Sequence, residues 1–159
     1  MSVTIREMTD GDAPRVVEFV HGLAEHIGQT IAPRVTPEGL TGNRDLIDVI
    51  VAEDNGRLIG ACLSLMTYST WRGAKGLYVV DLFIEGAARG RNVGLLLLRQ
   101  AANRGIARGA RFIKLEVDHA NEGAARFYQR LGFNRKDEDR LFILEHDMLG
   151  QLVQTKEMS

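Results

Sequence analysis

Apolar and polar positions along the chain follow two repeating patterns, one typical of strands and the other typical of helices. Strand-like alternation or a short apolar run occurs in six segments, at residues 3–6, 46–52, 59–68, 77–84, 112–117 and 141–144. Helical spacing of apolar residues predicts a helix that ends near residue 27, two more at 93–108 and 121–131, and a short one at 37–42. Strands that alternate with helices in this way predict one α/β domain over residues 1–159.

Turn-forming residues separate several of these segments. Asp54–Arg57 (DNGR) predicts a tight hairpin turn, because Asn-Gly tolerates the positive φ angles that such a turn requires. Thr9–Asp12 offers N-cap residues for the first helix, while Gly109 and Gly132 end two later helices. The sequence contains no internal repeat, low-complexity tract or linker.

The most unusual stretch is GAARGRNVGLLLL at residues 86–98. It places Arg89, Gly90, Arg91 and Gly94 between an apolar strand and an apolar helix. The free N–H groups and the dipole at a helix start favour an anion, and glycines let the backbone approach it. The stretch lacks both the P-loop and the dinucleotide-binding glycine patterns. It therefore predicts a phosphate-binding loop, with a plain strand–helix connection and solvated arginines as the alternative.

Composition and charge narrow the classes of function. The chain has 159 residues, of which 45% are hydrophobic and 26% charged, as is ordinary for a globular protein. A net charge of −1 argues against nucleic-acid binding, which usually requires a basic excess. The N-terminus has no apolar signal core and no apolar run approaches about 18 residues, so we expect a cytoplasmic protein without a membrane segment.

Cysteine usage gives no sign of a metal site or a disulfide. The single cysteine, Cys62, excludes an internal disulfide and leaves too few thiolates for a structural zinc site. Its neighbours are apolar, so we expect a buried strand residue rather than a nucleophile. Histidines and acids show no metal-ligand spacing either, and we expect no metal.

Two blocks of sequence, RGRNVG at 89–94 and NEGAARFYQRLGF at 121–133, resemble the GNAT superfamily of N-acetyltransferases. The loop at 89–94 is similar to its pyrophosphate loop, usually Arg-Gly-x-Gly-Ile-Gly, with Asn92 where the middle glycine is expected. Asparagine is the next best residue for a left-handed backbone, so we expect Asn92 to adopt one. The segment NEGAARFYQRLGF at 121–133 resembles the family's next block nearly residue for residue. The order of predicted strands and helices agrees with the same family.

Shorter stretches look like one branch of that family. MTYSTWRGAKGLYVVDLFI at 66–84 and LAEHI at 23–27 are similar to diamine/polyamine (spermidine/spermine-type) and thialysine acetyltransferases. Two acids of that branch are missing, because Val80 precedes Asp81 where glutamate is usual and Ile27 stands where an acid is expected. These departures argue against a dicationic polyamine as the substrate.

The resemblance implies a fold and an activity. The fold is a mixed, mostly antiparallel central sheet of about seven strands with about four helices, whose central strands splay apart to hold coenzyme A. The activity is transfer of an acetyl group from acetyl-CoA to a primary amine of a small molecule, by direct attack in a ternary complex. A homodimer is expected on the same ground. A protein or peptide acceptor, or a non-catalytic acyl-CoA-binding module, is the alternative.

The resemblance also assigns the cofactor residues and a proton donor. The strand end and the loop hold the pantetheine and the pyrophosphate, a role that falls to Leu82, Phe83, Ile84, Arg89, Gly90, Arg91, Asn92, Val93, Gly94, Leu95 and Asn121. Tyr128 aligns with the tyrosine that protonates the leaving thiolate. A core aromatic beside Phe127 is the alternative for Tyr128.

The general base and the acceptor pocket draw on a second group of residues. Asp81 interrupts an apolar strand, and burying a lone acid costs free energy unless it has a partner or a function. Asp81 and Glu116 are therefore catalytic candidates, directly or through water, with an ion-paired acid and a solvated strand face as their alternatives. The residues expected near the acceptor are His26, Tyr68, Trp71 and His119. His119 is a candidate base or relay near neutral pH, with an exposed loop residue as the alternative.

Overall fold

The computed structural model describes residues 2–156 and divides the chain into two compact units, with the boundary between Asn121 and Glu122. The first unit contains a five-stranded sheet with the order β1-β2-β3-β4-β5. Its strands are β1 (Val3–Glu7), β2 (Asp48–Asp54), β3 (Arg57–Ser69), β4 (Ala74–Ile84) and β5 (Ala110–Leu115). Neighbouring strands are antiparallel except β4 and β5, which are parallel and are joined by the crossover helix α3 (Val93–Ala107).

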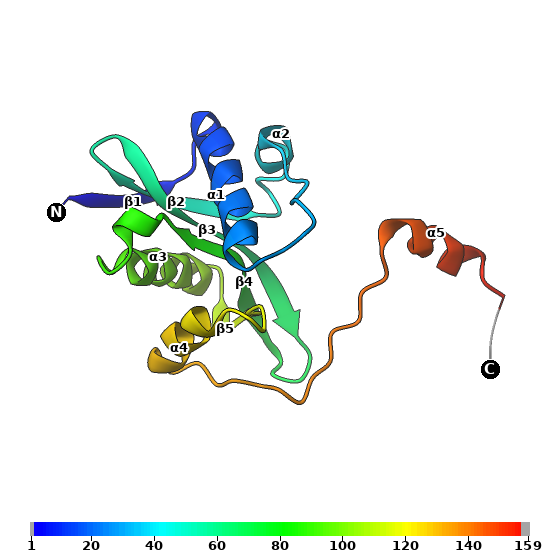
Figure 1. The fold of residues 1–159 in the computed structure, drawn as a ribbon. Helices are drawn as coiled ribbons and strands as arrows, with labels where there is room; N and C mark the ends of the chain where they lie inside the picture. Colours follow the sequence, from blue (N-terminus) through cyan, green and yellow to red (C-terminus); the bar gives the residue numbers. More distant parts are fainter. Residues whose placement is uncertain (1, 157–159) are drawn as a thin grey trace. The chain divides into compact units, whose positions relative to one another are not determined.

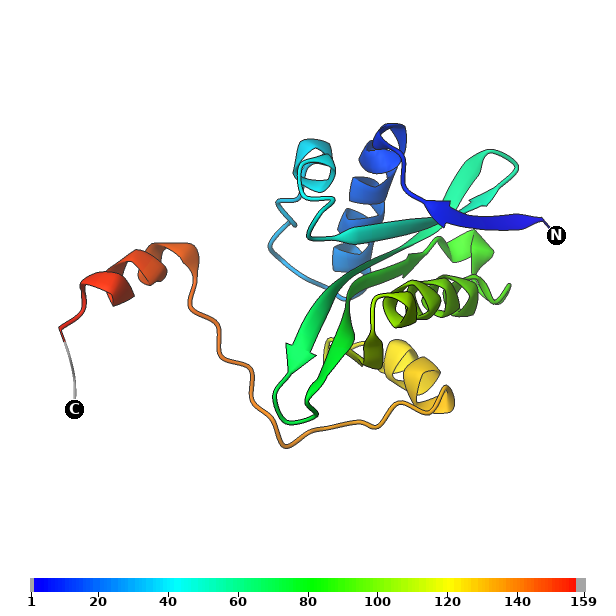
Figure 2. The same cartoon turned by 180° about the vertical axis from the view of Figure 1, so that it is seen from behind.

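Helices cover both faces of this sheet (Figures 1 and 2). On one side α1 (Ala13–His26) and α2 (Pro37–Thr41) enclose a cluster of buried residues that includes Phe19 and Leu63. On the other side lies α3, where a Cβ on Gly105 would stand 3.4 Å from Leu77 of β4. The sheet therefore has an α1 face and an α3 face, and each polar side chain on β4 points to one of these two faces.

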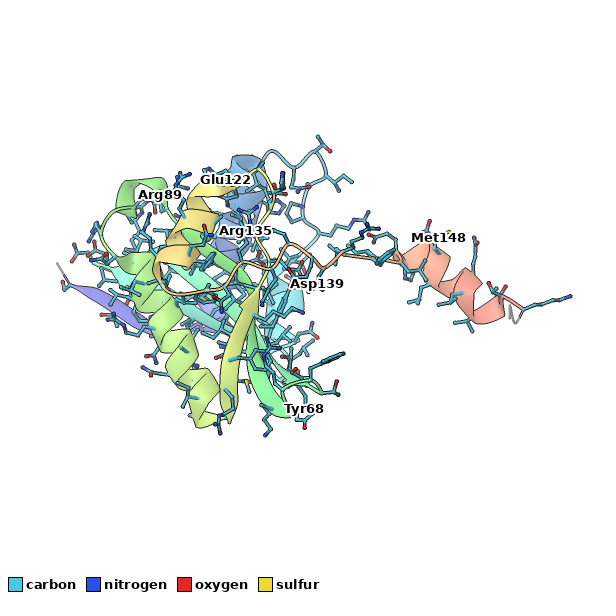
Figure 3. All side chains as sticks on the ribbon, turned by 90° about the horizontal axis from the view of Figure 1, so that it is seen from below. Tyr68, Arg89, Glu122, Arg135, Asp139 and Met148 are labelled. Atoms are coloured by element: carbon cyan, nitrogen blue, oxygen red, sulfur yellow. The ribbon has the colours of Figure 1, made fainter. Side chains whose placement is uncertain are left out.

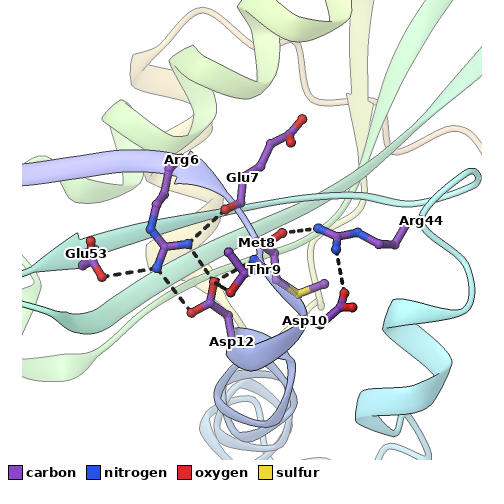
Figure 4. Close-up of polar contacts among 8 residues, drawn as sticks. All are labelled: Arg6, Glu7, Met8, Thr9, Asp10, Asp12, Arg44 and Glu53. Atoms are coloured by element: carbon purple, nitrogen blue, oxygen red, sulfur yellow. Dashed lines mark hydrogen bonds and ion pairs between the residues drawn. The ribbon is translucent and has the colours of Figure 1, made fainter.

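The entry into α1 is fixed by a polar network (Figure 4). A short 3₁₀ helix (Asp10–Asp12) precedes α1, and the Thr9 N–H donates to the Asp12 carboxylate at 2.8 Å. Arg6 of β1 donates to Asp12 at 2.7 Å and to Glu53 of β2 at 3.2 Å. This agrees with the helix start predicted at Thr9–Asp12, and it joins two strands to the helix.

The tight turn between β2 and β3 is confirmed. Asn55 and Gly56 have φ angles of 53° and 78°, the positive values expected of an Asn-Gly hairpin turn. The start of β2 differs from the prediction, because Leu46 lies in a turn whose N–H donates to the Asn43 carbonyl at 3.0 Å. The strand therefore begins at Asp48 instead of residue 46.

The second unit contains α4 (Glu122–Arg130) and α5 (His146–Gln154). The strand predicted at 141–144 is wrong, because those residues carry no strand and Leu141 and Phe142 are 69% and 88% exposed. A short apolar segment becomes a strand only where a neighbouring strand pairs with it. The described chain thus has five strands and five α-helices, in place of the expected seven and four, within the same α/β class.

Candidate active site

The site begins where β4 and β5 part. The two strands pair only as far as Val79 and Leu115, whereas β4 continues to Ile84. At the same point β3 and β4 change register, and Val80 is passed over between the pairs that Val79 and Asp81 make. Such a bulge bends a strand. The edge of β4 that faced β5 therefore has no strand partner beyond Val79 among the described residues, which leaves a row of backbone donors and acceptors.

The loop after β4 has the geometry of an anion site. A 3₁₀ turn (Gly86–Ala88) leads to Gly90, whose φ is +82°, and a Cβ built there would meet nothing within 4 Å. Asn92 has a φ of 61°, which confirms the left-handed backbone expected of it. The first backbone bond of α3 runs from the Leu96 N–H to the Asn92 carbonyl, at 3.0 Å. The N–H groups from Val93 to Leu95 come before this bond, so they have no acceptor within the helix and point out of its start.

The two arginines of the loop have different partners. Arg91 forms an ion pair with Asp54 at 2.9 Å, which ties the loop to the β2–β3 hairpin. Arg89 is exposed, and the structure gives it no ion pair with any residue from 2 to 156 (Figure 3). Arg89 is therefore the loop cation available to a phosphate, while Arg91 holds the loop in place. This difference was invisible in the sequence.

The end of β4 supplies its backbone rather than its side chains. The Phe83 ring stacks on Phe19 of α1 with the ring centroids 4.7 Å apart, and Ile84 reaches the position where a Cβ on Gly60 would stand. These side chains are partly buried within the first unit, so they fix the strand. The unpaired backbone edge from Leu82 to Ile84 remains for a ligand, as the sequence resemblance implied.

Asp81 lies on the α1 face, two positions before Phe83 on β4 and opposite Leu63 of β3. Among the residues that the structure describes, its carboxylate has no hydrogen bond or ion pair. Burial raises the pKa of Asp81 from 3.8 to about 6. A half-buried, unpaired carboxylate with such a pKa is ionised at neutral pH and accepts a proton more readily than an ordinary aspartate.

Tyr78 and Glu116 form a pair across the divergence. The Tyr78 hydroxyl donates to Oε1 of Glu116 at 3.0 Å, joining β4 to the residue that follows β5. Burial and the carboxylates of Glu116 and Asp81 raise the pKa of Tyr78, so the hydroxyl keeps its proton. Sequence reasoning missed Tyr78. The available signal was a lone hydroxyl within an apolar strand, three positions before Asp81.

The loops after α1 and after β5 are joined. Gln29 donates to Asp118 at 3.2 Å, and a second oxygen of Asp118 accepts the Ala120 N–H at 2.9 Å. His26 and His119 lie on the two joined segments and are both exposed. The structure thus joins the two segments that carry these histidines, while the roles of His26 and His119 remain predictions.

Tyr68 and Trp71 are not brought to Asp81. Tyr68 pairs with Lys75 near the β3–β4 turn, and Lys75 is six positions from Asp81, about 20 Å along an extended strand. Tyr68 is 65% exposed and Trp71 is 98% exposed. Within one chain these two aromatic residues form a different part of the surface.

Tyr128 belongs to α4 of the second unit. Its ring lies 5.1 Å from that of Phe127 and 5.3 Å from that of Phe133, measured between centroids. Asn121 is the last residue of the first unit, and its N–H donates to the Asp118 carbonyl at 2.8 Å. The roles of Tyr128 and Asn121 toward a cofactor stay predictions.

Cys62 is confirmed as a buried strand residue, and burial raises the pKa of its thiol to about 12. Within residues 2–156 no group of three or more His, Cys, Asp or Glu side chains is arranged to hold a metal ion. None of the helices in that part of the chain is long and apolar enough to cross a membrane.

Known structures share this fold. An integron cassette protein of V. cholerae superposes with a TM-score of 0.78 and 20% identity, covering 98% of this chain and 99% of its own. An aminoglycoside acetyltransferase from an uncultured soil metagenomic sample, in complex with sisomicin, superposes with a TM-score of 0.73 and 14% identity, covering 91% and 96%.

Sequence comparison identifies the family. Thialysine N-epsilon-acetyltransferases of Sus scrofa and Bos taurus are 26% and 25% identical to the chain, covering 82% of it and 84% and 83% of their own lengths. The acetyltransferase (GNAT) family model matches residues 25–133, which is more than half of the chain. The protein therefore belongs to the GNAT family and is an enzyme that transfers acetyl groups.

Proposed function

We propose that the protein transfers the acetyl group of acetyl-CoA to a primary amine of a small molecule, by direct attack while both substrates are bound. The observation that carries the proposal is the parting of β4 from β5 beyond Val79, directly before the free N–H groups of α3. An unpaired strand edge suits an amide-containing arm, and a helix start suits a pyrophosphate. The thialysine acetyltransferases among its relatives support a small amine acceptor.

Binding of the cofactor would use the loop and the strand end. The backbone from Gly90 to Leu95 would cradle the pyrophosphate, and Arg89 would add its charge. The backbone from Leu82 to Ile84 would align the pantetheine arm, with Asn121 at its far end. The open space at Gly90 fits this role, because a phosphate can approach the backbone there without meeting a side chain.

The acceptor would bind on the α1 face beside the parting strands. An amine arrives as an ammonium ion, and the carboxylates of Asp81 and Glu116 would attract it. The Tyr78 hydroxyl holds Glu116 in one orientation, at 3.0 Å. His26 and His119 would border this pocket. Because glutamate and a second acid are replaced by Val80 and Ile27, we expect an acceptor with one ammonium group near the reaction centre, not a polyamine.

Proton transfer would then involve one residue at the attacking amine and another at the departing thiolate. Acetyl-CoA supplies the activated thioester. Asp81, with a pKa of about 6, would take the proton of the ammonium ion, directly or through water, and so release the nitrogen lone pair. As the N–C bond forms and the C–S bond breaks, the Tyr128 hydroxyl would give a proton to the departing thiolate, and the acetylated nitrogen would lose its second proton through water, which restores the Tyr128 hydroxyl. The protein's main contribution is holding two reactants in line.

The proposal extends to the organisation of the molecule. We propose that residues 1–159 act as one functional domain in the cytoplasm and that the active protein is a homodimer. Tyr68 and Trp71, which lie away from Asp81 within one chain, would meet an acceptor only through such an assembly or through a long substrate.

The test is release of the coenzyme A thiol from acetyl-CoA with a panel of amines. The panel contains thialysine, lysine, putrescine, spermidine, aminoglycosides and short peptides. We expect turnover on thialysine or another amine with one nearby ammonium group, and little on spermidine. Turnover on peptides alone would replace the small acceptor with a protein. Acetyl-CoA that neither turns over nor raises the melting temperature would refute the cofactor site itself.

A further inference from the structure

A hollow outside the candidate active site lies in the first unit, at the turn between β3 and β4 and beside the start of β5. It has a volume of about 690 Å³ and is lined by residues that include Tyr68, Arg72, Lys75, Gly109, Arg111 and Phe112. We call it the hairpin hollow. The 15 residues of α3, about 22 Å of helix, separate the loop that precedes α3 from Gly109. Tyr68 and Arg89 lie toward opposite ends of α3 in Figure 3.

The charge of the hairpin hollow is unbalanced. Arg72, Lys75 and Arg111 line it, and none of the acidic residues between positions 2 and 156 does. None of the three forms an ion pair with any described residue, whereas Arg6 and Arg104 of the same unit each bind two carboxylates. Three cations side by side repel one another unless an anion lies between them. The three exposed cations therefore favour a ligand that carries more than one negative charge.

Two of the three cations have contacts within the fold. The Arg72 guanidinium lies 4.6 Å from the centre of the Phe112 ring, and the Arg72 backbone N–H donates to the Ser69 hydroxyl at 3.1 Å. Lys75 crosses Gly109, where a Cβ would stand 3.3 Å from its Cδ. The φ of Gly109 is +99°, so a glycine suits this position on both counts. Arg72 and Lys75 are thus placed before any ligand arrives, which lowers the entropy cost of ordering these two side chains.

Flat surfaces adjoin the charges. The Tyr68 side chain lines the hollow and is 65% exposed. The Arg72 guanidinium and the Phe112 ring form a second flat surface. Aromatic and guanidinium planes bind planar rings by stacking, and arginine binds phosphate through paired hydrogen bonds. A volume of about 690 Å³ is in the usual range for a small-molecule site.

From these observations we propose that the hairpin hollow binds a phosphate ester that carries a planar ring, of the class of nucleoside diphosphates. The phosphates lie among Arg72, Lys75 and Arg111, and the ring lies on Tyr68. This site is separate from the loop before α3 and goes beyond the proposed acetyl transfer. It requires neither acetyl-CoA nor an acceptor amine.

Trp71 provides a built-in probe for this site. It is the only tryptophan of the chain, it precedes Arg72 directly, and it is 98% exposed. ADP is titrated into the full-length protein while Trp71 fluorescence is recorded, first without and then with saturating coenzyme A. Pyrophosphate, adenosine and a short single-stranded RNA are titrated in parallel. We expect ADP to change the signal in both conditions and to bind at least ten times more tightly than pyrophosphate or adenosine.

Variants then assign the signal to the hollow. Lys75→Gln and Arg111→Gln each remove one phosphate contact, and we expect each to raise the Kd for ADP about ten-fold. Arg99→Gln removes an exposed cation of α3 that does not line the hollow. It is the matched control and should leave the Kd unchanged. With saturating coenzyme A present, which occupies the loop before α3, Arg89→Gln should also leave it unchanged. Circular dichroism verifies that every variant is folded.

Four outcomes would overturn the proposal. Unchanged affinity in Lys75→Gln and Arg111→Gln would exclude the hollow as the ADP site. Weaker ADP binding by Arg89→Gln would place ADP in the loop before α3. Pyrophosphate that binds as tightly as ADP would exclude recognition of the ring. RNA that binds more tightly than ADP and is lost in the same variants would assign the hollow to a nucleic acid. The Trp71 fluorescence change requires no turnover, so the ADP test remains valid even if the acetyl-transfer assay fails.

Discussion

Replacing Asp81 with asparagine should make the protein more stable and less active. The unpaired carboxylate is held on the α1 face at a cost, since burial raises its pKa from 3.8 to about 6. Each pKa unit corresponds to about 1.4 kcal/mol. The rise therefore lowers the free energy of unfolding by at most about 3 kcal/mol once the carboxylate is ionised. Asparagine removes the charge but keeps a polar amide, so we expect a gain of about 1–3 kcal/mol at pH 8.

The dependence on pH has a definite sign. Below pH 4 Asp81 is protonated in both the folded and the unfolded chain. The stabilities of wild type and Asp81→Asn should then differ only by the replacement of a neutral carboxyl group with an amide. Between pH 4 and 6 the unfolded chain loses its proton first, which favours unfolding of the wild type. The advantage of the variant therefore grows over this range and is constant above it.

Urea unfolding of both proteins from pH 4 to 8, with thiol release measured on the same samples, provides the assay. Loss of a general base should lower turnover about 10²–10⁴-fold. Asp12→Asn is the matched control with the opposite sign, because the hydrogen bond from Arg6 holds the pKa of Asp12 down, at about 2. That variant should be less stable than wild type above pH 4. Equal stability of Asp81→Asn and wild type at pH 8, or a gain independent of pH, would refute the reasoning.

Three further substitutions test the site. Tyr78→Phe frees Glu116 from its hydrogen bond and should raise KM for the amine several-fold with little change in kcat at saturation; a change in the Kd of acetyl-CoA instead would contradict this. Gly90→Val forces a branched side chain into a backbone with a φ of +82° and should weaken acetyl-CoA binding at least ten-fold in calorimetry; unaltered affinity would show that the pyrophosphate lies elsewhere. Tyr128→Phe should lower kcat about 10²-fold or more while acetyl-CoA affinity stays the same; full turnover would remove Tyr128 from the mechanism.

Local features of the molecule were predictable from short stretches of sequence. The hairpin turn at Asn55, the left-handed backbone of Asn92 and the helix start at Thr9 depend on the steric and hydrogen-bonding preferences of a few adjacent residues. The burial of Cys62 follows from its apolar neighbours in the same way. The strand predicted at 141–144 failed for the complementary reason, since a strand also needs a partner that its own residues do not specify.

The arrangement of the site depended on contacts between distant segments. Which strand lies beside β4, and where the two part, is decided by register and by the bulge at Val80. The same pairing joins Tyr78 to Glu116 and separates Tyr68 from Asp81, although the sequence suggested one acceptor pocket for both. It also ties Arg91 to Asp54 and leaves Arg89 for an anion. The sequence by itself determined the local turns and the loop conformation, because these depend on neighbouring residues. Only the tertiary structure decided which polar groups are paired and which remain for a ligand, because their partners lie tens of residues away.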